Sequence, residues 1–134
     1  MIKLTLAEVV QAVQGRPWGE LPTVSVGGIS TDSRSVAASD LFFALRGPRF
    51  DGHDFAVAAL KRGAVAVVVD TAKAQSVAEQ LRVADIPLPR QAVLIEVKDT
   101  IAALGRLAAY HRRQAAAAVI AVVGSNGKTT TKAM

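Results

Sequence analysis

Residues 64–69 read Ala-Val-Ala-Val-Val-Val, a continuous apolar run between Gly63 and Asp70. Such a run is typical of a strand buried on both faces, as in a parallel sheet that helices cover. Three further segments have the composition of strands, at residues 24–29, 40–45 and 92–97. Helices are indicated before the first strand, at residues 6–13, and between later strands, at residues 55–62 and 72–83. This alternation predicts an α/β fold with a mixed, largely parallel sheet and flanking helices.

The first and last helices carry local signals at their ends. Thr5 and Glu8 form a capping box at the start of the first helix, and Gly15 is expected to end it. A longer helix is predicted to begin after Asp99 or Thr100. Its apolar stripe and its basic end are expected at Ile101, Leu104, Ala108 and His111, and at Arg112 and Arg113.

Composition limits the class of protein. Hydrophobic residues make up 51% of the 134 residues and charged residues 20%, which predicts a folded core. The chain has no cysteine, so a disulfide scaffold, a thiolate zinc site and a cysteine nucleophile are excluded. We expect neither a membrane span nor a secretory signal, and hence a cytoplasmic chain. The net charge of +5 is scattered, which favours a solvated basic surface over a nucleic-acid face.

Residues 119–131 carry the strongest local motif. Val-Ile-Ala-Val-Val predicts a last buried strand, and Gly-Ser-Asn-Gly-Lys-Thr-Thr-Thr follows it at 124–131. A strand that leads into such a turn is the context of a phosphate loop, whose backbone N–H groups cradle phosphates. Lys128 would reach the β- and γ-phosphates of ATP, and the Thr129 hydroxyl would ligate Mg²⁺. The candidate ATP-binding residues are Gly124, Ser125, Asn126, Gly127, Lys128, Thr129 and Thr130.

Two observations bear on this motif. The general pattern places a glycine where Val122 stands, so an ordinary glycine-rich turn before a helix is the alternative interpretation. A nucleotide-binding domain that begins here needs further strands to bury its sheet. We therefore expect a first domain at residues 1–97, and at 98–134 the first helix, strand and phosphate loop of a truncated nucleotide-binding domain. Residues 119–123 would then stay mobile or be covered by a partner chain, through self-association.

Three segments together resemble the Mur ligases of peptidoglycan synthesis, at residues 30–34, at 40–47 with 50–55, and at 124–132. The family's own phosphate loop is similarly short. Two of its members share the first motifs, one adding the third amino acid to UDP-N-acetylmuramoyl-dipeptide and the other adding D-alanyl-D-alanine to the tripeptide. The Phe-Asp-Gly-His-Asp-Phe run at 50–55 and the Lys-Ala-Met at 132–134 are more similar to the second.

The resemblance implies a reaction and its cofactors. ATP with Mg²⁺ phosphorylates the terminal carboxylate of the UDP-linked peptide, and the amine of D-alanyl-D-alanine attacks the acyl phosphate. Such an enzyme serves cell wall biogenesis, cell shape and cell division. We expect this chain to be the first part of such a ligase, binding the UDP end of the substrate and inactive by itself. The alternatives are the ligase that acts on the dipeptide, a stand-alone uridine-nucleotide-binding module, and a phosphate-loop protein that binds nucleic acid.

The resemblance also points to a binding site for UDP. It assigns no catalytic residue within these 134 residues. The candidates for the UDP site are Ser30, Thr31, Ser33, Arg34, Arg46, Asp51 and His53. Arg34 suits a diphosphate, since a guanidinium binds phosphate with two parallel hydrogen bonds. The alternative is a turn whose side chains only satisfy their own backbone. Asp32 is the exception among the residues of this segment, because we expect it to pair with Arg34 and order the turn. For Arg46 the alternative is a surface arginine, and for His53 it is a cap of the following helix.

Overall fold

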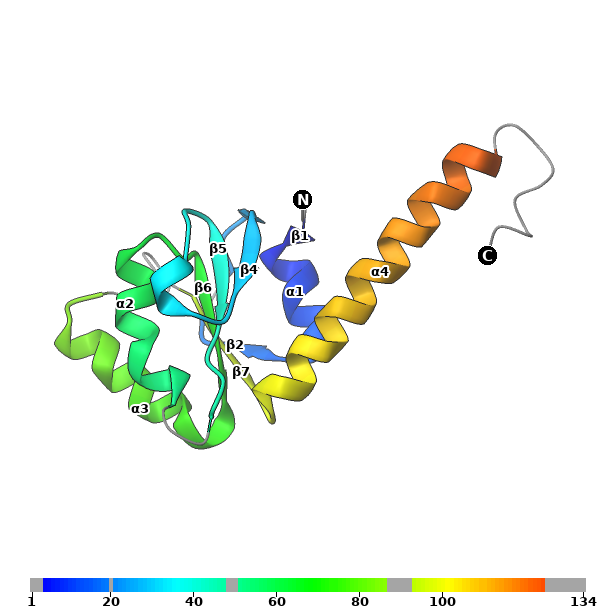
Figure 1. The fold of residues 1–134 in the computed structure, drawn as a ribbon. Helices are drawn as coiled ribbons and strands as arrows, with labels where there is room; N and C mark the ends of the chain where they lie inside the picture. Colours follow the sequence, from blue (N-terminus) through cyan, green and yellow to red (C-terminus); the bar gives the residue numbers. More distant parts are fainter. Residues whose placement is uncertain (1–3, 20, 48–50, 87–92, 125–134) are drawn as a thin grey trace.

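A five-stranded sheet forms the centre of the molecule (Figure 1). The computed structural model describes residues 4–19, 21–47, 51–86 and 93–124, with side chains up to residue 113. The sheet has the order β2-β7-β6-β5-β4, in which β4 to β7 are parallel and β2 is an antiparallel edge. Its strands are β2 (Arg16–Pro17), β4 (Gly28–Ser30), β5 (Asp40–Phe43), β6 (Ala66–Asp70) and β7 (Leu94–Val97). The mixed, largely parallel sheet is therefore confirmed.

Helices cover both faces of this sheet, and two short strands form a separate ribbon. The helices are α1 (Leu6–Val13), α2 (Ala56–Lys61), α3 (Thr71–Val83) and α4 (Thr100–Gly124). The ribbon pairs β1 (Leu4–Thr5) with β3 (Ser25–Val26), and two 3₁₀ turns are η1 (Ser33–Ser35) and η2 (Gly52–Phe55). The capping box is confirmed: the Thr5 hydroxyl accepts from the Glu8 N–H at 3.1 Å, and the Thr5 N–H donates to the Glu8 carboxylate at 3.0 Å. The left-handed residue that ends α1 is Gln14, one position before Gly15.

Alternate side chains of each central strand enter two different cores. In β6, Val67 and Val69 pack with α2 and α3, whereas Ala66 and Val68 pack on the opposite side with α1 and α4. Every residue of β6 is buried, as expected for a parallel strand between two helical layers. The apolar run that predicted the fold therefore supplies its central strand, although the strand spans Ala66–Asp70 rather than residues 64–69.

The predicted strand at residues 24–29 is wrong as a single element. Ser25 and Val26 belong to the ribbon, while Gly28 and the next two residues enter the main sheet as β4. The break falls at Gly27, whose N–H donates to the Ser39 carbonyl at 2.8 Å. This hydrogen bond belongs neither to the ribbon nor to the main sheet. The residues before Gly27 therefore pair in the ribbon, and those after it pair in the main sheet.

Helix α4 corrects three predictions. Among the described side chains of this helix, Ala103 and Leu107 are buried and Leu104 packs against the same core, whereas Ile101 is 60% exposed. The predicted stripe is therefore right at Leu104 and wrong at Ile101, and it omits Leu107. The helix runs on past Arg112 and Arg113 to Gly124, and these arginines do not mark its end. Residues 119–123 are helical, so the predicted strand there is wrong. In the described part of the chain no strand lies beside them, and the preceding alanines favour helix, which satisfies the backbone within the segment.

The first turns of α4 belong to the core on the α1 side of the sheet. Leu107 is fully buried there, and the Tyr110 hydroxyl donates to the Glu8 carboxylate at 3.1 Å. The rest of α4 extends away from the body (Figure 1). The domain boundary at 97/98 stays a prediction, and these contacts place Leu107, ten residues beyond it, against the first domain.

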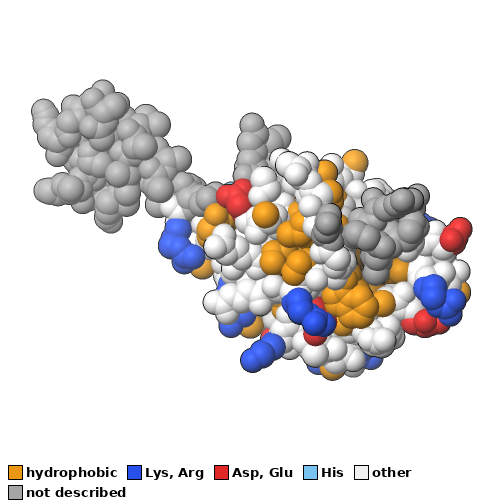
Figure 2. Space-filling model, turned by 180° about the vertical axis from the view of Figure 1, so that it is seen from behind, with side chains coloured by type: hydrophobic (Ala, Val, Ile, Leu, Met, Phe, Trp, Pro, Cys, Tyr) orange, Lys and Arg blue, Asp and Glu red, His pale blue; other side chains and the backbone are white. Residues whose placement is uncertain are grey.

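The surface is mixed in character. Figure 2 shows one face on which apolar side chains gather near the centre, with single Lys and Arg side chains around them. No helix in the described ranges combines the length and the apolar character needed to cross a membrane.

Candidate functional site

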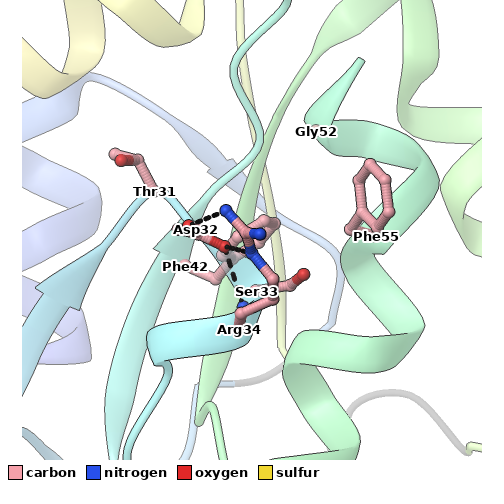
Figure 3. A pocket seen from close by; sticks show the side chains of 7 residues that line it. All are labelled: Thr31, Asp32, Ser33, Arg34, Phe42, Gly52 and Phe55. Atoms are coloured by element: carbon pink, nitrogen blue, oxygen red, sulfur yellow. Dashed lines mark hydrogen bonds and ion pairs between the residues drawn. The ribbon is translucent and has the colours of Figure 1, made fainter. Parts of the chain in front are cut away.

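A pocket of about 560 Å³ lies where the chain leaves the carboxyl ends of β4 and β5. Loops at the carboxyl ends of parallel strands are the usual ligand sites of α/β sheets. Two segments form it, one around η1 and the other around η2 (Figure 3). Its lining residues are Thr31, Asp32, Ser33, Arg34, Phe42, Gly52 and Phe55.

The polar wall of the pocket is the turn at residues 30–35. Asp32 caps η1 by accepting from the Arg34 N–H at 2.9 Å, and its two carboxylate oxygens accept from Arg34 Nε and Nη2 at 3.1 and 2.9 Å. These hydrogen bonds, from the Arg34 side chain first and its backbone second, lower the pKa of Asp32 to about 2. The Asp32–Arg34 pair that the sequence suggested is therefore confirmed. Ser30 is buried beneath the turn, and its hydroxyl donates to the Asp32 carbonyl at 2.8 Å.

The apolar wall faces this pair. Phe42 in β5 is 1% exposed, whereas Phe55 at the end of η2 is 41% exposed and presents its ring at the opposite side of the hollow (Figure 3). Gly52 lies so close to Leu45 that a Cβ would meet its backbone N and O at 2.8 and 2.9 Å. Only glycine allows this approach. None of these three lining residues was among the candidates named from the sequence, although all three lie within the segments that carried the resemblance.

Behind the pocket lies a cluster of ionisable groups around His53, which is 1% exposed. Its Nδ1 is 2.6 Å from the Asp51 carboxylate, and its Nε2 accepts from the Asp70 N–H at 3.1 Å. Arg46 pairs with the Asp70 carboxylate at 3.2 Å, and Lys73 pairs with that of Asp51 at 3.4 Å. Burial acts to raise the pKa of Asp51, but hydrogen bonds from the backbone and ring of His53, with Lys73, lower it overall.

The structure thus divides the candidate UDP residues into two groups. Thr31, Ser33 and Arg34 line the pocket, and Ser30 supports them from below. Arg46, Asp51 and His53 meet one another in the ionisable cluster instead. Of the candidate ATP residues, Gly124 is the last residue of α4, and 125–130 lie outside the described residues. Within the described ranges no three His, Asp or Glu side chains are grouped to hold a metal ion.

Known proteins resemble this chain along its whole length. Residues 25–112 match the model of the Mur ligase family, catalytic domain. The chain is 39% identical to the UDP-N-acetylmuramoyl-tripeptide–D-alanyl-D-alanine ligase of Escherichia coli over 134 residues, which is 100% of this chain and 26% of that protein. The enzyme of the same name from Bacillus subtilis is 37% identical, covering 100% of this chain and 27% of its own length.

A ligase with a different name and a solved structure match this chain with similar identity and coverage. A UDP-N-acetylmuramoyl-L-alanyl-D-glutamate–2,6-diaminopimelate ligase from Geobacter sulfurreducens is 40% identical, covering 94% of this chain and 22% of that protein. The crystal structure of MurF from Acinetobacter baumannii superposes with a TM-score of 0.65 at 30% identity, over 85% of this chain and 22% of that one. The chain therefore spans about a quarter of the length of the relatives it matches.

Proposed function

Because the chain belongs to the Mur ligase family, we propose that it forms the UDP-binding part of an ATP-dependent ligase that adds D-alanyl-D-alanine to UDP-N-acetylmuramoyl-tripeptide. The names of the two ligases from Escherichia coli and Bacillus subtilis support this reaction. The observation that carries the UDP assignment is the pocket, since it unites the 30–34 turn with Gly52 and Phe55 from the second motif.

The two walls of the pocket match the two ends of a uridine diphosphate. Phe55 offers a partly exposed aromatic face, against which a flat pyrimidine ring packs well. Arg34 offers a guanidinium that Asp32 holds through Nε and Nη2, and within the described residues Nη1 makes no hydrogen bond. A diphosphate oxygen would therefore be bound by Nη1, while Asp32 keeps the side chain in place. The hydroxyls of Thr31 and Ser33 supply further donors at the same rim.

ATP and Mg²⁺ belong to the same proposal. Formation of an acyl phosphate requires ATP, with a metal ion to offset the charge of the phosphates. The motif at 124–131, whose Lys128 and Thr129 were assigned to these groups, supports it from the sequence alone. No residue of the described part is assigned to the chemical step, and the role proposed for it is to hold one end of the substrate. A cytoplasmic location and roles in cell shape and division follow as part of this proposal.

A second candidate function is ligation of diaminopimelate to the UDP-linked dipeptide. The 40% identity with the Geobacter sulfurreducens ligase of that name favours it, while the match to the Escherichia coli D-alanyl-D-alanine ligase covers 100% of this chain against 94% for the Geobacter protein. The same pocket serves both, because the two substrates share their UDP end.

Calorimetry of the 134-residue chain with UDP-N-acetylmuramoyl-tripeptide, UDP and ADP tests the proposal. We expect both uridine ligands to bind and ADP to bind more weakly. Arg34→Ala should weaken binding roughly ten- to a hundredfold, the range for a charge-assisted hydrogen bond, and the loss should shrink with added salt. Arg82→Ala is the matched control, because Arg82 is also an exposed arginine paired with a nearby carboxylate, that of Glu79. Equal affinities for Arg34→Ala and the wild-type chain, or binding regardless of the base, would contradict the assignment.

A further inference from the structure

His53 is buried against the pocket rather than exposed in it. Its ring is 1% exposed, and both of its nitrogens contact other groups of the protein. The neighbouring Gly52 and the nearby Phe55 both line the pocket. A ligand in the pocket therefore meets the residues on either side of His53, while the ring itself stays covered.

The two contacts of the ring determine where its proton lies. The Asp70 N–H is a backbone donor, so Nε2 accepts from it and carries no proton. Nδ1 must then carry the proton and donate it to the Asp51 carboxylate at 2.6 Å. The structure thus holds one tautomer of His53, with Nδ1 protonated and Nε2 as the acceptor.

Charged groups around the ring complete the arrangement. The Asp70 carboxylate lies 3.8 Å from Nε2 and is paired with Arg46, while Lys73 pairs with the Asp51 carboxylate. Asp70 also caps α3, since its Oδ1 accepts from the Lys73 N–H at 3.1 Å. Each carboxylate beside the histidine therefore has a cation of its own, and the cluster joins η2 to the carboxyl end of β6.

We propose that His53 is a positioning residue for nucleotide binding, which in its Nδ1-protonated form fastens the turn at residues 51–55 to the end of β6. This holds Gly52 and Phe55 where they form the pocket wall. The turn is also tied to the segment that follows β5, where the Gly52 N–H donates to the Leu45 carbonyl at 2.7 Å and Asp51 forms an isolated antiparallel bridge with Arg46. The inference rests on the proposed binding of a uridine nucleotide, but it makes a separate claim about the ring.

Two substitutions separate the two contacts. His53→Gln places an amide oxygen near the position of Nε2 and keeps an acceptor for the Asp70 N–H. His53→Asn keeps only a donor near Nδ1 for Asp51 and leaves the buried Asp70 N–H without its partner. We expect His53→Asn to weaken UDP binding by roughly tenfold, as the loss of one buried hydrogen bond does when it loosens a binding site. His53→Gln should lose clearly less, and His111→Gln, which changes the only other histidine of the chain, should bind as the wild type does.

Nuclear magnetic resonance tests the two contacts of the ring directly, whereas the affinities of the Asn and Gln variants test their effect on binding. Long-range ¹H–¹⁵N spectra should show a protonated Nδ1 and an unprotonated Nε2 for His53, with the two histidines assigned from His111→Gln. Hydrogen exchange at the Asp70 amide should be slow in the wild type and in His53→Gln, and faster in His53→Asn. A proton on Nε2, or an Asp70 amide that is equally protected in His53→Asn, overturns the proposal, as does wild-type affinity in a folded His53→Asn.

The same measurements separate failure of this inference from failure of the proposed function. If the wild-type chain binds no uridine nucleotide, the assignment of the pocket fails. The tautomer and the exchange of the Asp70 amide then still decide whether His53 fastens the turn. If His53→Asn does not fold, the tautomer in the wild type and the affinity of His53→Gln decide the question, and a Gln variant that loses more than tenfold contradicts the proposed role of Nε2.

Discussion

Leu107 provides a direct test of how α4 joins the molecule. It is fully buried in the core on the α1 side of the sheet, whereas Ile101 on the same helix is 60% exposed. Truncating a fully buried leucine to alanine removes buried apolar area and leaves a cavity, which costs about 2–5 kcal/mol. Ile101→Ala on the exposed side should change the free energy of unfolding by less than about 0.5 kcal/mol.

Urea denaturation followed by circular dichroism measures this difference. With a slope of about 2 kcal/mol per molar urea, the middle of the usual range, Leu107→Ala should lower the midpoint by roughly 1–2.5 M. The midpoint of Ile101→Ala should stay close to that of the wild type. The stripe expected from the sequence predicts the opposite order, since it places Ile101 against the body and leaves Leu107 out. A larger loss for Ile101→Ala, or no loss for Leu107→Ala, would refute the packing of α4 described here.

Three further predictions concern the pocket and α1. The pKa of the Asp32 carboxyl, measured by NMR titration, should be about 2 in the wild type and return toward 3.8 in Arg34→Ala. The contribution of this pair to stability is therefore present above the unfolded pKa of about 4 and is lost as the pH falls through about 2. An unchanged titration midpoint in the variant contradicts this. Gly52→Ala should destabilise the fold and reduce UDP binding, because the new Cβ meets the Leu45 backbone. Gly105→Ala in α4 is the comparison: its new Cβ has nothing within 4 Å, and it should stabilise the chain by up to about 1 kcal/mol. Thermal melts that rank the two variants the other way would be inconsistent with the structure. Thr5→Ala should lower the free energy of unfolding by about 1 kcal/mol through loss of the capping box, and a melt equal to that of the wild type would count against it.

The sequence predicted correctly those elements whose residue pattern is compatible with only one local structure. Residues 64–69 are apolar at every position, and only a strand with two buried faces suits them within an α/β alternation. The capping box at Thr5 and the pair of Asp32 with Arg34 were also predictable, because each joins residues two or three positions apart. Local chemistry decides such features without knowledge of the tertiary structure.

Where the pattern is ambiguous, the sequence left the answer open or misled. Helix α4 is rich in alanine, so its polar and apolar sides contrast weakly, and Leu107 was missed in favour of Ile101. Residues 119–123 are short, apolar and β-branched, a composition that suits a buried strand or a helix equally well. The His53 cluster depends on Asp70, seventeen residues away in the sequence, and only the parallel arrangement of β5 and β6 brings the two together.

The most direct test of the central claim locates bound UDP on the molecule. Amide chemical shifts of the ¹⁵N-labelled chain are followed during a titration with UDP, with ADP as the comparison ligand. The proposed site predicts that the largest changes occur in residues 31–34 and at Gly52 and Phe55, with little change in α1, and that ADP causes smaller changes. Shifts that cluster away from this pocket, or equal responses to both nucleotides, would contradict the proposal that this chain recognises the uridine end of the substrate.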